Sequence, residues 1–208
     1  MLQSTTSRLS HATSQATQTI HMTHSEMIKL KYRGALIAML GSFAPDYMVT
    51  LTFRRKIKRD LFDKIIKDFT FRLHNTIYGD KSEKAVSAYL CCEYKTSTNL
   101  HLHMLIKDPM RTMSAARLEM FNVLKNPLYL SQIIRRCWIE AGEQYGRITG
   151  DPKKTSRQSE WFQTVDDPFE AAEYCTKEVK YGNEDLINWM YSTPKGRRHR
   201  NKRSPVTH

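Results

Sequence analysis

The sequence predicts an α+β domain in which an antiparallel β-sheet packs against helices. Four short stretches have the β-branched and aromatic content of strands, and amphipathic helical stretches separate them. A short polar loop joins the second and third of these strands, as in a hairpin. The resulting order, β-α-β-β-α-β-α, is typical of an α+β domain, and the chain has no internal repeat.

Composition divides the 208 residues into three parts. Residues 1–25 are rich in Ser, Thr, Gln and His, and we expect them to lack stable structure on their own. Residues 26–192 have the apolar periodicity of one folded domain, and residues 193–208 form a basic tail that is too charged to pack. No apolar run could span a bilayer, and four cysteines without CxxC spacing suit a reducing compartment. We therefore expect a soluble intracellular protein without membrane association.

The first elements of the predicted domain are a helix, a strand and a second helix. Residues 26–42 are predicted to be helical, with or without a break at Gly34, and residues 47–53 (YMVTLTF) to form a strand. The basic stretch 54–59 leads into an amphipathic helix. Its apolar residues recur at helical spacing: Leu61, Ile65, Ile66, Phe69 and Leu73.

Two strands joined by a tight loop come next. Residues 85–94 and 100–107 are the predicted strands, and Asp108-Pro109 ends the second because a residue before proline is disfavoured in helical conformation. Helices are expected near 112–124 and 129–144. The latter has an apolar side that consists of Ile133, Ile134, Cys137, Trp138 and Ala141.

The last part of the domain begins with a polar, basic loop at 146–159. A short strand at 160–165 leads to Asp166-Asp167-Pro168, where an Asp cap followed by proline is typical of a helix start. We expect this helix to run to about residue 179, with a last short helix over 184–191.

Two histidines on the third strand are the first candidate functional residues. Side chains alternate along a strand, so His101 and His103 share one face, and we expect helices to leave that face uncovered. Across the hairpin, Glu93 falls close to this pair, and two imidazoles with a carboxylate can hold a divalent metal. The alternative is that both histidines are structural or merely exposed.

A tyrosine and a lysine on the predicted last long helix are the second candidates. Tyr174 and Lys177 are three residues apart and therefore share one helix face. A phenol is a weak nucleophile near neutral pH, but a neighbouring cation or a metal on the target phosphate makes its attack feasible. The alternative is an ordinary amphipathic helix with a half-buried tyrosine and a solvated lysine.

The charge balance indicates a polyanionic partner. Lys and Arg number 33 against 21 Asp and Glu, which gives a net charge of +12. Such an excess favours nucleic acid through counterion release, although a basic surface without a partner would show it too. The basic residues that we expect to bind nucleic acid are Arg54, Arg55, Lys153, Lys154, Arg197, Arg198 and Arg200.

In order along the chain, these motifs resemble those of a known superfamily. VTLTF at 49–53, HLH at 101–103 and YCTK at 174–177 are similar to the three motifs of the HUH endonucleases, and specifically of rolling-circle replication initiators with one catalytic tyrosine. The run YCTKE at 174–178 is particularly similar to the third motif of initiators from small circular single-stranded DNA viruses and related plasmids. The resemblance covers about residues 47–182.

The resemblance implies a fold, a cofactor and a chemistry. The fold would be a ferredoxin-like or RRM-like antiparallel sheet with helices packed on one face. His101, His103 and Glu93 would hold Mg²⁺ or Mn²⁺ at the scissile phosphate of single-stranded origin DNA. Tyr174 would attack that phosphate to leave a 5′-phosphotyrosine and a free 3′-hydroxyl, with assistance from Lys177, and a later 3′-hydroxyl would rejoin the strands.

Several departures and alternatives accompany the resemblance. The chain has no GxxxxGK[ST] phosphate loop, so we expect a host helicase and polymerase as partners. Tyr181 lies about two helical turns after Tyr174 and is a second candidate nucleophile. The resemblance implies the cytoplasm of a bacterial or archaeal host, or the nucleus for a eukaryotic virus. The alternatives are a single-tyrosine HUH transposase, a relaxase, and a non-catalytic RRM-like nucleic-acid-binding module.

Overall fold

The computed structural model describes residues 23–80, 82, 84–93, 101–120, 128–152 and 161–177, with the side chains of Glu93, Met120 and Leu128 left outside this description. Several predictions fall on other parts of the chain. The residues concerned are Tyr181, Lys153, Lys154, Arg197, Arg198 and Arg200, together with the polar N-terminal segment up to residue 22 and the helix expected at 184–191.

The predicted α+β class is confirmed by a four-stranded antiparallel sheet in the order β2-β3-β1-β4. These strands span Ala88–Glu93 (β2), His101–Ile106 (β3), Tyr47–Thr52 (β1) and Phe162–Thr164 (β4). The central pair, β1 and β3, are joined in full register from Tyr47 opposite Ile106 to Thr52 opposite His101. All four strands were predicted from the sequence, with ends that differ by one to three residues from those observed.

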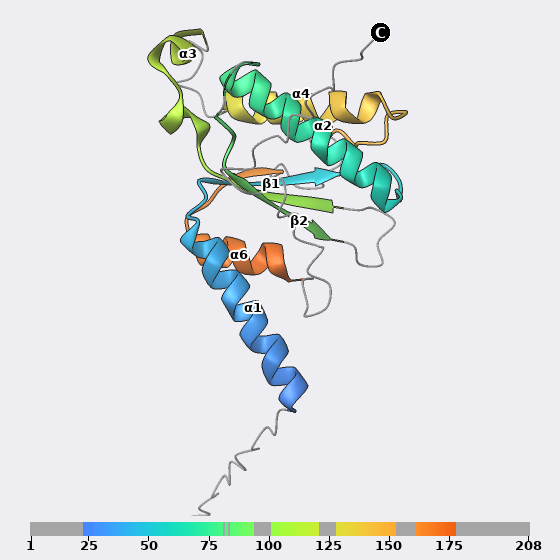
Figure 1. The fold of residues 1–208 in the computed structure, drawn as a ribbon, viewed down its shortest axis with the longest axis vertical. Helices are drawn as coiled ribbons and strands as arrows, with labels where there is room; N and C mark the ends of the chain where they lie inside the picture. The colour runs from blue at the N-terminus through green and yellow to red at the C-terminus, as the bar shows by residue number, and fades with distance from the viewer. Residues whose placement is uncertain are drawn as a thin grey trace, which may run out of the picture.

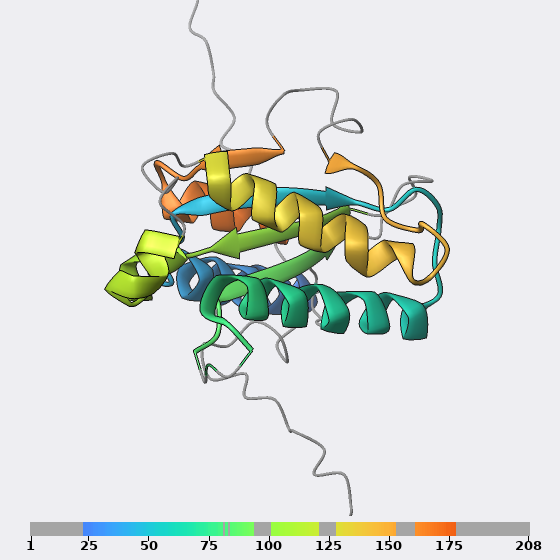
Figure 2. The ribbon, with the colours of Figure 1, turned by 90° about the horizontal axis from the view of Figure 1, so that it is seen from above.

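One face of the sheet packs against α2 (Arg59–Tyr78) and α4 (Leu128–Glu143), which lie side by side across it (Figures 1 and 2). The predicted apolar sides of both helices are buried against this face. Trp138 of α4 is fully buried, contacts Phe53 and Phe69 edge-on, and donates a hydrogen bond from its indole to the carbonyl of Thr52 at 3.2 Å. This aromatic cluster joins the two helices to β1 and forms the centre of the core.

The opposite face of the sheet is also covered, by α1 (His24–Ser42) and α6 (Pro168–Thr176) (Figure 1). The expectations that helices would pack on one face only, and that the histidine face would be uncovered, were therefore wrong. The physical reason is visible in the sequence of β3: Leu105 has the same parity as His101 and His103 and needs burial. Leu105 and its neighbour on β2, Cys91, are both fully buried under the second helical layer.

Helix α1 begins two residues before the predicted start and runs without a break at Gly34. The start is set by a capping box, in which the Thr23 side chain accepts from the Glu26 amide and the Glu26 carboxylate accepts from the Thr23 amide. Near its other end, Gly41 allows α6 to approach closely, since a β-carbon there would stand 2.5 Å from the ring of Phe169. Arg33 and Glu173 form an ion pair between the two helices at 3.3 Å.

Two short helical elements follow β3 in place of the predicted start of a helix near residue 112. A 3-10 turn, η1 (Pro109–Thr112), is capped by Asp108, and α3 (Ala115–Met120) comes after it. Proline at the first position and the Asp cap explain why this turn starts early. Within the described residues, no helix combines the length and apolar character needed to cross a membrane.

Packing at Gly142 yields a stability prediction. A β-carbon at Gly142 would lie 2.6 Å from two carbon atoms of Thr149, which is buried and bridges to Phe53. We expect Gly142→Ala to lower the free energy of unfolding by about 1–3 kcal/mol through overpacking. The matched control is Gly34→Ala, where nothing lies within 4 Å and better helix propensity should add up to about 1 kcal/mol. Urea unfolding measures both variants, and equal stability of Gly142→Ala and wild type would contradict this packing.

Candidate active site

The histidine pair lies at the centre of the sheet, on the face that α6 covers. His103 is only 2% exposed, whereas His101 is partly exposed at the beginning of β3. Nδ1 of His103 and the hydroxyl of Thr50, directly opposite on β1, share a hydrogen bond at 3.2 Å. This bond orients the imidazole and leaves Nε2 as the nitrogen through which His103 would bind a metal.

Helix α6 starts where the sequence predicted. The carboxylate of Asp167 accepts hydrogen bonds from the amides of Phe169 and Glu170, and Pro168 occupies the first turn. Its inner face consists of small residues that are all buried: Ala171, Ala172, Cys175 and Thr176. Small side chains on this face let the helix axis approach the sheet closely.

This close approach brings Tyr174 to the histidines. The rings of Tyr174 and His103 meet edge to face, with centroids 5.2 Å apart and planes at 74°. Tyr174 is nevertheless 45% exposed, so a phenol in contact with a buried imidazole remains open to a large substrate. Sequence reasoning placed both residues in one site, and the structure brings them together.

Lys177 also reaches Tyr174, as the predicted spacing requires. Its ammonium nitrogen lies 4.2 Å from the centroid of the Tyr174 ring, at the C-terminal end of α6. A cation over a tyrosine ring is attracted by the negative face of the ring. The cation therefore lies beside the phenol whose oxygen would develop charge during attack.

Buried sulfur groups join α6 to the sheet beneath Tyr174. Sγ of Cys175 lies 3.8 Å from Sδ of Met48, and its thiol also interacts with that of Cys91 on β2. Hydrogen bonding with Cys91, together with burial, raises the pKa of Cys175 well above its ordinary value. All four cysteines are free and buried, in agreement with the prediction of unpaired thiols.

The residues for a divalent cation fit in type and register. Glu93 lies directly opposite His101 in the β2–β3 ladder, as the sequence predicted. Two imidazoles and a carboxylate form a donor set suited to Mn²⁺ or, with water ligands, Mg²⁺. Among the residues whose side chains are described, which exclude Glu93, no group of three His, Cys, Asp or Glu comes together. The metal assignment therefore stays a prediction based on residue type and register.

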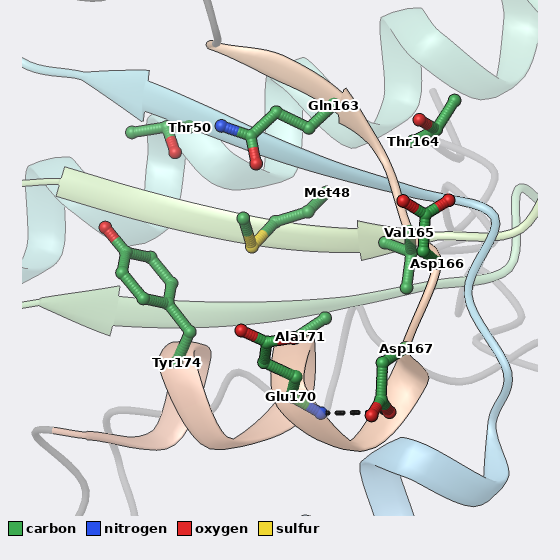
Figure 3. Close-up of a pocket in the computed structure, with 10 residues that line it drawn as sticks. All are labelled: Met48, Thr50, Gln163, Thr164, Val165, Asp166, Asp167, Glu170, Ala171 and Tyr174. Carbon is green, nitrogen blue, oxygen red and sulfur yellow. Dashed lines mark hydrogen bonds between the residues drawn. The ribbon is translucent and has the colours of Figure 1, made fainter.

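A pocket of about 470 Å³ opens beside Tyr174, between β4 and the first half of α6 (Figure 3). The sequence interpretation did not include it, because its walls come from three separate segments. The signals were Gln163 on the predicted fourth strand and the acidic residues at the start of the following helix. The lining residues are Met48, Thr50, Gln163, Thr164, Val165, Asp166, Asp167, Glu170, Ala171 and Tyr174.

Basic side chains lie at the other end of β1. Arg54 and Arg55 are exposed just after Thr52, which pairs with His101. The guanidinium of Arg55 comes within 3.9 Å of where a β-carbon of Gly146 would stand, next to the exposed Arg147. The end of the sheet that holds His101 is therefore flanked by cations from two distant segments.

Fold and site together define an α+β domain that presses a tyrosine-bearing helix against a paired-histidine strand. Residues 46–183 match the family described as Replication-associated protein ORF2. The match covers well over half of the chain, and the chain belongs to this family as a replication-associated protein of the initiator type. No curated protein and no solved structure matches the chain.

The raised pKa of Cys175 predicts slow, pH-shifted alkylation. A thiol whose pKa is raised stays protonated at a pH where an ordinary cysteine has begun to ionise, and only the thiolate reacts. We expect the rate of Cys175 modification by iodoacetamide in the folded protein to rise with a midpoint above the ordinary value of 9.0. Peptide mass spectrometry measures the rate, with urea-unfolded protein as control. Equal rates in folded and unfolded protein would show that Cys175 is neither buried nor shifted.

Proposed function

We propose that the chain is a single-tyrosine HUH endonuclease that initiates rolling-circle replication by nicking single-stranded origin DNA. The observation that supports this most is the contact between the half-exposed Tyr174 ring and the buried His103 ring. Membership of a replication-associated family favours this function over transposition.

The proposed reaction is a transesterification at phosphorus. The phenolic oxygen of Tyr174 forms a bond to the scissile phosphorus, and the bond from phosphorus to the 3′-oxygen breaks. The phenolic proton passes to water, and the departing oxygen takes up a proton to become a free 3′-hydroxyl. The number of phosphodiester bonds is unchanged, so a later 3′-hydroxyl can reverse the step and join strands.

Each neighbouring residue has a role in this scheme. Lys177 would stabilise negative charge that develops around the phenol and the phosphate. Thr50 would keep the His103 imidazole in one orientation and tautomer. His101, His103 and Glu93 would hold Mg²⁺ or Mn²⁺, which when bound polarises the scissile phosphate.

The partners follow from charge and from the need for an unpaired strand. Arg54, Arg55 and Arg147 lie where phosphates of a strand crossing the sheet towards Tyr174 would pass. The target would be melted or extruded origin DNA, with a host helicase and polymerase extending the 3′-hydroxyl in the host cytoplasm or nucleus.

A non-catalytic RRM-like module is disfavoured by the covering of the sheet. Such modules stack bases on aromatic side chains of an open sheet face. Here the corresponding face is occupied by α1 and α6, and Cys91, His103 and Leu105 on it are buried. Bases would have no open stacking platform at the centre of this sheet.

The central test is a covalent adduct with single-stranded DNA. Protein incubated with labelled single-stranded fragments of its replicon and Mn²⁺ should give a labelled band that survives denaturing electrophoresis. Tyr174→Phe removes the attacking oxygen and should abolish the band, as should a chelator. His103→Ala should reduce adduct formation at least about 100-fold, within the range for loss of key metal-site or catalytic groups.

A matched tyrosine makes the test specific. Tyr145→Phe alters a partly buried tyrosine after α4 and should leave adduct yield unchanged. An adduct that persists in Tyr174→Phe would refute the nucleophile assignment and direct attention to Tyr181.

Salt dependence tests the basic end of the sheet. Replacing Arg54 and Arg55 together by alanine should weaken binding of every single-stranded sequence alike. The slope of log affinity against log salt should fall by about 0.7 for each phosphate that the double variant no longer neutralises. Lys64→Ala, on the exposed side of α2, is the control and should leave the slope unchanged. An unaltered slope in the double variant would place the DNA elsewhere.

A further inference from the structure

We propose that the pocket between β4 and α6 is a subsite for one unpaired nucleobase next to the phosphate that Tyr174 attacks. It would select a base with an exocyclic amino group, namely cytosine, adenine or guanine, over thymine. This inference rests on the proposed function, because it takes Tyr174 as the nucleophile.

The position of the pocket connects it to the reacting groups. Tyr174 forms one wall, and Thr50, which holds His103, forms another (Figure 3). A base that flanks a phosphate at Tyr174 must lie beside that residue, and this hollow adjoins it. Its volume of about 470 Å³ lies within the usual range for small-ligand pockets.

The charge of the lining excludes the phosphate backbone as its occupant. Asp166, Asp167 and Glu170 are the charged residues of the lining, which contains no Lys or Arg. Arg54 and Arg55, in contrast, lie beyond the opposite end of β1. A strand that placed its phosphates near the arginines and turned a base towards the carboxylates would satisfy both ends.

Two carboxylates and an amide are positioned to read such a base. Asp167 is occupied in capping α6, but Asp166 and Glu170 are exposed and, within the described residues, their carboxylates take part in no hydrogen bond or ion pair. Gln163 on β4 and Glu170 on α6 lie on opposite sides of the space (Figure 3). The thioether of Met48 and the methyl group of Ala171 add apolar surface for the face of a ring.

The pairing chemistry decides between the bases. Carboxylates accept hydrogen bonds, and amino groups of cytosine, adenine and guanine donate them. An unpaired base presents these groups on its Watson–Crick edge. Thymine has carbonyl oxygens on both sides of its single N–H donor, and these would face the carboxylates. The pocket is thus complementary to an amino-bearing base and disfavours thymine.

The experiment uses the full chain with a randomised single-stranded DNA library and Mn²⁺. Covalent adducts are isolated under denaturing conditions, the attached and released fragments are sequenced, and base frequencies are compared on each side of the nick. Wild type should deplete thymine roughly tenfold at one position flanking the nick. Glu170→Gln and Asp166→Asn should lose most of that discrimination at the same position only.

Glu173→Gln is the matched control. Glu173 is exposed on the same helix but is paired with Arg33 on α1, outside the pocket lining, so its base preferences should equal those of wild type. Unchanged thymine depletion in both pocket variants would overturn the proposal. An equal rise in adducts for all bases would overturn it too, because the carboxylates would then merely repel the backbone.

Absence of any adduct would refute the proposed function, and the pocket would then be judged by binding. Fluorescence anisotropy of oligo-dC, oligo-dA and oligo-dT with the full chain measures discrimination without nicking. Tighter binding of oligo-dC and oligo-dA than of oligo-dT, lost in Glu170→Gln, supports the subsite. Equal binding of all three overturns it.

Discussion

Close packing of α6 against β3 and β1 is the constraint on which the rest of the site depends. Ala172 and Thr176 have no exposed surface, and the hydroxyl of Thr176 donates back to the carbonyl of Ala172 at 2.8 Å. A buried polar group is thus satisfied within the helix. Gly41 allows α1 to hold α6 from the other side. Larger residues at these positions would move the helix away and separate Tyr174 from His103.

This packing produces a site that is rigid beneath and open above. The imidazole of His103 is fixed by Thr50 below, while Tyr174 and Lys177 remain accessible at the surface. The aromatic cluster around Trp138 supports the sheet from the far side. A fixed imidazole beside an exposed phenol is the arrangement that phosphoryl chemistry needs, because positioning and electrostatics do most of its work.

Local periodicity explains what could be predicted from the sequence. Alternation along β3 placed His101 and His103 on one face, and helical spacing placed Lys177 beside Tyr174. The strands, the Asp167 cap and the register of Glu93 against His101 follow from equally short-range signals. The capping box at Thr23 was also visible in the sequence, and it would have corrected the start of the first helix.

Long-range packing explains what could not be predicted. The second helical layer follows from Leu105 on the histidine face, yet parity alone does not say which helices cover it. Cys91 and Cys175 come together from segments far apart in the chain. The pocket beside Tyr174 likewise has walls from β1, β4 and α6, and no single stretch of sequence contains it.

The central claim is that Tyr174 becomes covalently attached to the 5′ end of the nicked strand. Nuclease digestion of a purified adduct followed by tandem mass spectrometry locates the attached nucleotide directly. The account predicts a nucleotide joined through its 5′-phosphate to the peptide that contains Tyr174, with the phenolic oxygen as the site of attachment. Attachment to Tyr181 or to any other residue, or a nick with a free 5′-phosphate and no modified peptide, would contradict it.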